Sequence, residues 1–275
     1  MDYMQVDTVG LIKPTLDQFI GRSFAVLGQT GQGKSNTVAV AGEFHGLCKY
    51  ESIESVGRSF DQPSLIDVHM GNVEEVAATV YQEGRQVIFD VSGYEDESLK
   101  VQVVEAYIEH VWRMSGRYRY PHTIILEEAQ QWVPQRGSTG ISSRLGEIAT
   151  QGRKRGLALG IISQRSQAVN KNVLSQVSTY FLHSVSHPAD LKVYYDIAPY
   201  PNKRTKQIFS RYKVGQALYM HSDVAMTVKI RRSPVELGGY TPSLSSIPDR
   251  PNRPLVEQME LFNPPQSEPA NAYTD

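Results

Sequence analysis

The stretch that decides the fold is Phe24-Ala-Val-Leu27, which runs directly into Gly28-Gln-Thr-Gly-Gln-Gly-Lys-Ser35. The first four residues form a short apolar run, typical of a strand that is buried on both faces of a parallel sheet. Glycines in the second segment let the chain curl so that backbone N–H groups point inward, and a helix is expected to follow. The segment fits the phosphate-binding pattern G-x-x-x-x-G-K-[ST], so we predict a nucleotide site at this junction.

Positions within this loop have distinct expected roles. Lys34 would reach the β- and γ-phosphates, and the Ser35 hydroxyl would bind Mg²⁺. The helix behind the loop adds the positive end of its dipole. The predicted nucleotide-binding residues are Gly28, Gln29, Thr30, Gly31, Gln32, Gly33, Lys34, Ser35 and Asn36.

Two carboxylates follow the apolar run Thr123–Leu126, at the carboxyl end of another predicted strand, where α/β sheets place their ligands. Glu127 would hold Mg²⁺ through its water, and Glu128 would be the general base that orients the attacking water. A small-molecule kinase needs no such base, and Asn202-Lys-Arg-Thr205 does not complete the guanine-reading pattern N-K-x-D. The paired acids therefore favour an ATPase over a solvated charge pair that opens a helix.

Polar and basic residues flank the predicted strand Leu157–Ser163. Gln164 follows the strand and could sense the γ-phosphate, or it could be a simple turn residue. Gly152-Arg-Lys-Arg-Gly156 precedes the strand and has two interpretations. It is an arginine finger that acts on a neighbouring subunit's nucleotide, or a basic helix end that contacts DNA phosphates or solvent. The segment alone favours the second interpretation.

Strands and helices alternate along the chain, which predicts an α/β fold with a mainly parallel sheet. Further strands are expected at 64–68, 86–90 and 179–185, and a β-hairpin at 216–221 and 225–230. Helices are expected at 73–82, 97–114, 142–155, 190–197 and 203–212. Residues 241–275 contain 7 of the 15 prolines, so we predict a tail or arm beyond a core of residues 1–240.

Charge is spread unevenly along a chain whose net charge is only −1. Residues 113–232 hold 19 Lys and Arg against six Asp and Glu, whereas residues 1–112 hold seven against 17. This basic middle indicates an anionic partner such as nucleic acid, unless the acidic and basic parts simply offset each other within one fold. Lys171 is the residue expected to contact DNA, in a polar loop where Asn170 and Asn172 could bond phosphate oxygens; a solvated surface turn is the alternative.

Composition excludes several classes of protein. A chain of 275 residues with 40% hydrophobic and 21% charged residues is ordinary for a globular protein, which rules out a disordered or fibrous chain. Cys48 is the only cysteine, so an internal disulfide is impossible. The sequence has neither a signal-peptide pattern nor an apolar stretch of about 18 residues, so we predict a cytoplasmic protein with no membrane contact.

These motifs, in this order, resemble the HerA/FtsK class of hexameric DNA-pumping ATPases, and most closely the HerA type. The resemblance covers roughly residues 20–240. It is carried by Gly28–Ser35, Gly42–Leu47, Ile124–Gln130 with Val133-Pro134, Gly152–Gly156, Ser163–Arg165 with Val173–Gln176, and Gly238–Pro242. It implies a RecA-like P-loop NTPase fold, with ATP and Mg²⁺ as ligands.

The resemblance also implies roles and partners. Gln164 becomes the strand sensor and Arg153 the finger, which reverses the preference drawn from the basic segment alone; Lys154 and Arg155 are then expected to contact DNA or solvent. The implied activity is ATP-driven translocation or unwinding of double-stranded DNA by a homo-hexameric ring, often together with a nuclease or another effector. A viral-type genome-packaging ATPase and a nucleotide-switched scaffold remain alternatives, and a small-molecule phosphotransferase is disfavoured.

Two features depart from the family. Only about twenty residues precede the first strand, where the family usually has a β-barrel. Only Asn36–Ala41 separate Ser35 from the Gly42–Leu47 segment, too few for a full helix and a second strand. We therefore expect either that the first helix runs into a shortened region or that Ser64–Val68 supplies the missing strand.

Overall fold

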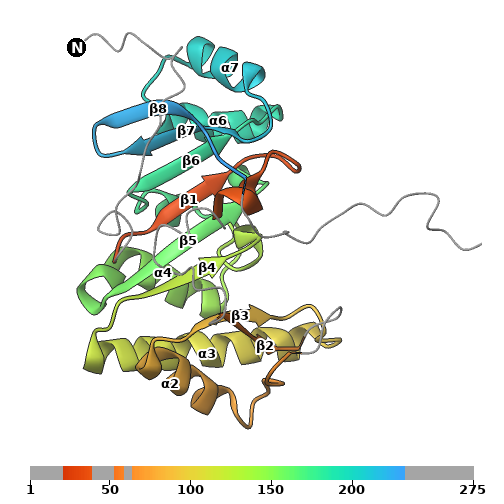
Figure 1. Cartoon of the computed structure of the whole chain (residues 1–275), viewed down its shortest axis with the longest axis vertical. Helices are drawn as coiled ribbons and strands as arrows, with labels where there is room; N and C mark the ends of the chain where they lie inside the picture. Colours follow the sequence, from red (N-terminus) through yellow and green to blue (C-terminus); the bar gives the residue numbers. More distant parts are fainter. Residues whose placement is uncertain (1–20, 39–52, 59–63, 233–275) are drawn as a thin grey trace, which may run out of the picture. The chain divides into compact units, whose positions relative to one another are not determined.

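A computed structural model describes residues 21–38, 53–58 and 64–232 of the chain. At its centre is a six-stranded sheet with the strand order β4-β5-β1-β6-β7-β8 (Figure 1). Its strands are β1 (Phe24–Leu27), β4 (His122–Leu126), β5 (Leu157–Ser163), β6 (Thr179–His183), β7 (Gln216–His221) and β8 (Val224–Lys229). Strands β4, β5, β1 and β6 are parallel, and β7 and β8 add an antiparallel hairpin. The predicted mainly parallel sheet with a hairpin is confirmed.

Strand β1 is buried on both faces, as its unbroken apolar sequence predicts. Ala25 and Leu27 belong to a large core that also contains residues of the helices. Phe24 and Val26 point to the opposite face, into a smaller core with Phe181 of β6 and with residues of the hairpin. The phosphate loop therefore starts from a strand that is held firmly from both sides.

The helices lie close to the predicted ranges, and a helix begins at Lys34 directly after the phosphate loop. The others are α2 (Val73–Glu83), α3 (Glu97–Tyr118), α4 (Gly140–Gln151), α5 (Lys171–Leu174), α6 (Pro188–Ile197) and α7 (Asn202–Arg211). Short 3₁₀ turns are η3 (Ala129–Gln131), η4 (Gly152–Arg155) and η5 (Ser166–Ala168).

Helix α4 differs from the predicted range 142–155 at both ends. It begins earlier because the Thr139 hydroxyl accepts a hydrogen bond from the Ser142 N–H at 3.2 Å, in a capping box. It ends at Gln151, where the chain tightens into η4. The basic segment is therefore a separate turn and not the last turn of α4.

One predicted strand is wrong. The segment Ser64–Val68 contributes a single bridge, between Ile66 and Val56. The strand is instead β2 (Ile53–Gly57), which pairs in parallel with β3 (Gln86–Asp90) in a separate two-stranded sheet. Apolar content was misleading here, because Leu65 and Ile66 are exposed to 67% and 41%.

Several sequence predictions lie outside the described residues. These are the Gly42–Leu47 and Gly238–Pro242 segments, the strand connection after Asn36–Ala41, and the tail at 241–275. Within the described ranges, no helix has both the length and the apolar character needed to cross a membrane.

Candidate nucleotide-binding site

The phosphate loop is anchored to the ends of the two strands that flank β1. The Gly28 N–H donates to the Ser163 carbonyl at 3.2 Å, and the Gln29 N–H donates to the Ser184 carbonyl at 3.1 Å. A side chain at position 28 would meet the His183 Cβ at 2.5 Å, so only glycine fits there. The loop thus emerges at the carboxyl edge of the parallel strands, where such sheets bind ligands.

The middle of the loop is open to the outside. Gly31 and Gly33 have φ values of +78° and +93°, which glycine adopts without strain. A Cβ at Gly31 would meet nothing within 4 Å, and the side chains of Thr30 and Ser35 are exposed. This open cradle of backbone N–H groups and hydroxyls fits the phosphates of a nucleotide.

Lys34 bridges the loop from inside. Its ammonium donates to the Gln29 carbonyl at 3.1 Å. Partial burial lowers the pKa of Lys34, and the nearby carboxylates of Glu128 and Glu127 offset part of that change. Both predicted acids therefore lie close enough to Lys34 to act on its charge, which is the arrangement that a bound phosphate chain requires.

Glu128 is held by two glutamine side chains. The Gln164 amide donates to one carboxylate oxygen at 2.9 Å, and the Gln130 amide donates to the other at 2.7 Å. The Ser163 hydroxyl donates to the Gln130 carbonyl oxygen at 2.7 Å, which fixes the direction of that amide. Glu128 itself has a left-handed backbone with φ of +47°, a conformation that turns the chain sharply after β4.

Gln164 also contacts the phosphate loop, because its carbonyl oxygen accepts a hydrogen bond from the Thr30 hydroxyl. A continuous chain thus runs from Thr30 through Gln164 to Glu128. Gln164 lies where the sequence places it, between the loop and the acidic strand end. Glu127, the residue before Glu128, is exposed, and so is Ser35 in the loop. Their oxygen atoms are ligands of the type that Mg²⁺ prefers, so the residues present fit the ion.

A buried histidine supports the loop from below. His183, at the end of β6, is fully buried, and its Nε2 lies 2.8 Å from the Thr37 hydroxyl. That hydroxyl also donates to the Gly33 carbonyl at 3.1 Å, so the pair ties β6 to the loop. Burial, together with a smaller effect of the positive charge of Lys34, lowers the pKa of His183 to about 4.

Four residues of the site carry no role predicted from the sequence: Gln130, Ser163, Thr37 and His183. Gln130 is the last residue of the motif Ile124–Gln130. Its position two residues after Glu128 is the feature from which a contact with Glu128 could have been predicted. Ser163 and His183 end two strands that are far from the loop in sequence, and Thr37 meets His183 from the helix after the loop, so no local pattern reveals these contacts.

Arg153 lies at the opposite edge of the sheet. It belongs to η4, which precedes β5, whereas Gln164 follows the same seven-residue strand. The length of β5 separates the two by roughly 20 Å, more than an arginine side chain spans. Arg153 is exposed and forms no ion pair among the described residues. It therefore cannot reach the nucleotide loop of its own chain.

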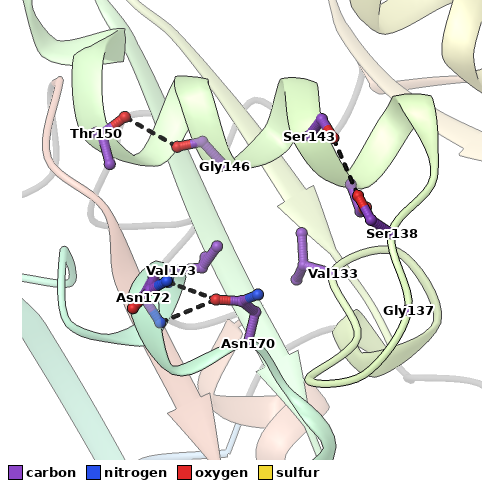
Figure 2. A pocket seen from close by; sticks show the side chains of 10 residues that line it. Val133, Gly137, Ser138, Ser143, Gly146, Thr150, Asn170, Asn172 and Val173 are labelled. Atoms are coloured by element: carbon purple, nitrogen blue, oxygen red, sulfur yellow. Dashed lines mark hydrogen bonds between the residues drawn. The ribbon is translucent and has the colours of Figure 1, made fainter.

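The Lys171 region is more ordered than the predicted loop. Asn170 caps α5, and its side-chain oxygen accepts from the N–H groups of Asn172 at 2.9 Å and Val173 at 3.4 Å (Figure 2). A phosphate oxygen would accept from the side-chain nitrogen of Asn170 and not from this oxygen, so the expected phosphate contact stays a prediction. The exposed Lys171 ammonium lies 3.5 Å from Asp196, a pair that solvent screens.

A groove of about 330 Å³ lies beside this segment, between α4 and α5 (Figure 2). Small and hydroxyl-bearing residues form much of its wall, including Ser138, Ser143, Gly146 and Thr150. Asn172 also lines the groove and is exposed, so its amide stays available for a phosphate oxygen.

Comparisons of sequence identify relatives. A model of the family described as "Helicase HerA, central domain" matches residues 11–41. The "DNA double-strand break repair helicase HerA" of Sulfurisphaera tokodaii is 26% identical over 53% of this chain and 30% of that protein. The protein of the same name from Pyrococcus furiosus is 34% identical over 35% of this chain and 18% of that protein. The chain thus spans less than a third of the length of these two relatives.

Comparisons of structure identify the fold. A DNA-packaging ATPase from Sulfolobus turreted icosahedral virus has a TM-score of 0.52 and 15% identity, and the match covers 78% of this chain and 99% of that one. VirB4 of Thermoanaerobacter pseudethanolicus has a TM-score of 0.51 and 11% identity, with 77% and 90% covered. These likenesses establish a P-loop NTPase fold. With the sequence relatives, they confirm the resemblance to the HerA/FtsK class.

Proposed function

We propose that this chain, whose core is that of a HerA/FtsK-class P-loop ATPase, hydrolyses ATP in a homo-hexameric ring and thereby moves along double-stranded DNA. The observation that carries the proposal is the hydrogen-bond chain from Thr30 through Gln164 to Glu128. It links the phosphate loop to the proposed base through the end of β5. Nucleotide binding at the loop therefore changes the hydrogen bonds of Glu128.

Binding uses the loop and Lys34. Backbone N–H groups of the curled loop face the phosphates, and the Lys34 ammonium exchanges its Gln29 carbonyl for β- and γ-phosphate oxygens. Ser35 and Glu127 would hold Mg²⁺, Glu127 through a water molecule. When bound, the ion neutralises charge that develops on the phosphate oxygens.

Hydrolysis requires a positioned water, and Glu128 is the residue proposed to orient it and accept its proton. A carboxylate offers about four acceptor sites, of which Gln130 and Gln164 use two, so the remaining lone pairs stay available to water. A γ-phosphate oxygen accepts hydrogen bonds, so it competes with the Gln164 carbonyl oxygen for the Thr30 hydroxyl. Gln164 therefore reports, at Glu128, whether the γ-phosphate is present.

Arg153 acts on the neighbouring subunit's nucleotide in this proposal. Its place at the far edge of the sheet suits a ring in which that edge of one subunit faces the loop edge of the next. A guanidinium stays charged when partly desolvated and stabilises the charge of the transferring phosphoryl group. We expect Arg153→Ala to bind an ATP analogue normally and to lose turnover by about 10³-fold or more, measured by phosphate release.

DNA is the proposed partner because of the basic residues 113–232 and the resemblance to HerA helicases. In a cellular role, a nuclease or another effector would bind the ring. In genome packaging, the same ATP hydrolysis would move a viral genome. A scaffold that binds ATP without DNA work is the competing function.

The test compares ATP hydrolysis with and without long duplex DNA at low salt. The proposal expects DNA to raise the rate several-fold in the wild-type protein and to have no effect in Glu128→Gln. A wild-type rate that duplex DNA leaves unchanged would favour the scaffold. Short duplexes serve as the matched control, since a motor that travels is stimulated more by long DNA.

A further inference from the structure

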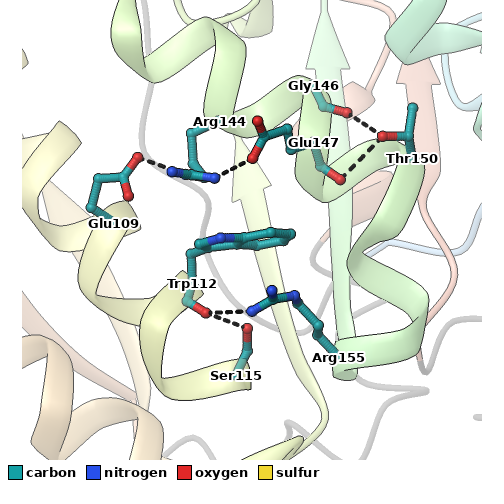
Figure 3. Close-up of polar contacts among 8 residues, drawn as sticks. All are labelled: Glu109, Trp112, Ser115, Arg144, Gly146, Glu147, Thr150 and Arg155. Carbon is teal, nitrogen blue, oxygen red and sulfur yellow. Dashed lines mark hydrogen bonds and ion pairs between the residues drawn. The ribbon is translucent and has the colours of Figure 1, made fainter. Parts of the chain in front are cut away.

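The turn that carries Arg153 is held by a stacked arginine. The Arg155 guanidinium lies 3.8 Å from the ring centroid of Trp112 in α3 and donates to the Trp112 carbonyl at 3.2 Å (Figure 3). Arg155, expected from the sequence to contact DNA or solvent, is half-buried and packs on α3. A planar cation that stacks on a ring and bonds its backbone is fixed in both distance and angle.

A second arginine completes a sandwich around the same ring. Arg144 of α4 lies over Trp112 at 5.1 Å (Figure 3). Its guanidinium donates to Glu109 of α3 at 2.6 Å and also bonds Glu147. Trp112 is only 9% exposed, so the stack is largely shielded from water. Helices α3 and α4 and the turn η4 thus meet at one tryptophan.

Glycines allow the turn to approach this closely. A Cβ at Gly116 of α3 would lie 2.7 Å from the Arg155 guanidinium. At the ends of η4, a Cβ at Gly152 would lie 2.9 Å from the Leu157 carbonyl oxygen, and one at Gly156 would lie 2.7 Å from the Tyr120 carbonyl oxygen. The turn is therefore clamped at both ends by backbone contacts and in between by Arg155.

This clamp decides where Arg153 points. Successive side chains of a 3₁₀ turn are about 120° apart, so Arg155 directed onto α3 turns Arg153 and Lys154 away from it. Both are indeed exposed. We infer that Arg155 and Trp112 are positioning residues that aim Arg153 at the nucleotide of the neighbouring subunit. This inference rests on the proposed function, because it presumes the ring and the role of Arg153.

The test is complementation between inactive variants. Arg155→Ala should lower turnover by about 10²-fold, since displacing a reacting group by about 1 Å has that effect, and should leave ATP-analogue affinity unchanged. Its own nucleotide site remains intact, so mixing it with Glu128→Gln should restore activity. In a one-to-one mixture about a quarter of the interfaces pair an intact Glu128 with an intact Arg153 edge. Mixing Arg155→Ala with Arg153→Ala should not restore activity, because in both variants the side of the interface that carries Arg153 is defective.

Controls separate positioning from folding. Arg117→Ala removes an arginine near the end of α3 that lies over Tyr118, and it should keep full turnover. If Arg155→Ala does not fold, Arg155→Lys takes its place in the same mixtures, because lysine keeps the charge and stem and loses the stacked plane. Trp112→Phe should be milder than either, since a smaller ring still stacks.

Two results would overturn the inference. One is full turnover in Arg155→Ala or Arg155→Lys. The other is recovery of Arg153→Ala by Glu128→Gln without recovery of the Arg155 variant in the same mixture. Failure of the Arg153→Ala mixture itself, with mixed rings shown to form, would instead contradict the proposed role of Arg153 and thus the premise.

Discussion

Lys34 is partly buried and has two carboxylate neighbours, and this predicts the effect of removing it. Burial lowers the pKa of its ammonium, while Glu128 and Glu127 favour the charged form. Lys34→Ala leaves those two carboxylates facing the phosphates without a cation. We expect it to abolish hydrolysis and to weaken ATP binding in a titration with a fluorescent analogue. Lys34→Arg is the control that keeps the charge, and it should bind more tightly than Lys34→Ala. Normal turnover in Lys34→Ala would place the phosphates elsewhere.

Glu128→Gln should behave differently from Lys34→Ala. The amide keeps the size of the carboxylate but cannot accept a proton, so ATP should stay bound and uncleaved. The measurement pairs equilibrium binding with single-turnover hydrolysis. Gln130→Leu should show part of the same defect, because one of the two bonds to Glu128 is lost. A Glu128→Gln variant that hydrolyses ATP at the normal rate would make Glu127 the next candidate base.

The loop of this site was predictable from sequence, and its supports were not. Glycine spacing and the lysine-serine pair carry their chemistry locally, so the pattern identifies them. Gln130 and Ser163 act through a contact between η3 and the end of β5, which are 33 positions apart. The packing of Arg155 was not predicted for a similar reason. Its partner Trp112 is 43 positions away, and neither residue belongs to a motif that demands the other.

At the scale of elements, apolar runs predicted the central strands β1 and β5 because those two strands are buried on both faces. The same criterion failed for β2, because a charged residue and a hydroxyl residue interrupt the apolar ones in its sequence Ile-Glu-Ser-Val-Gly. It pairs with a single strand and buries mainly its last two residues. Helix ends were less predictable, since the cap at Thr139 and the tightening at η4 depend on side-chain contacts.

The end of β6 beneath the phosphate loop should make stability depend on pH. The unfolded pKa of histidine is about 6.5, whereas burial lowers the pKa of His183 to about 4. The unfolded chain therefore binds the proton more readily, and the free energy of unfolding falls as pH drops through this window. The loss is about 3 kcal/mol between pH 7 and pH 4. Above about pH 7 this loss of stability is absent, because His183 is neutral in both the folded and the unfolded chain.

Denaturant unfolding of His183→Gln at several pH values measures this contribution. The variant should show a smaller fall in stability between pH 7 and pH 4 than the wild-type protein. His122, whose pKa burial also lowers to about 4, keeps its share in the variant and gives an internal reference. Equal slopes in the two proteins would mean that the pKa of His183 does not differ between the folded and the unfolded chain.

For the whole molecule, the uneven charge sets the expected behaviour toward DNA. A net charge of −1 gives no long-range attraction, so contact must come from local basic segments within residues 113–232. Contacts of this kind release counterions, and the DNA-stimulated rate should fall steeply as salt increases. The rate without DNA should change little over the same range.

Lys171 is the residue chosen for that contact, and its surroundings sharpen the prediction. It starts α5 beside the groove, next to Asn172, and its pairing with Asp196 is exposed and weak. Lys171→Glu should reduce the ratio of rates with and without duplex DNA toward one, and it should flatten the salt dependence of that ratio. Lys192→Glu makes the same charge change at an exposed position of α6 and should preserve the ratio. Equal losses in the two variants would mean that overall charge, and not the α5 segment, governs the contact with DNA.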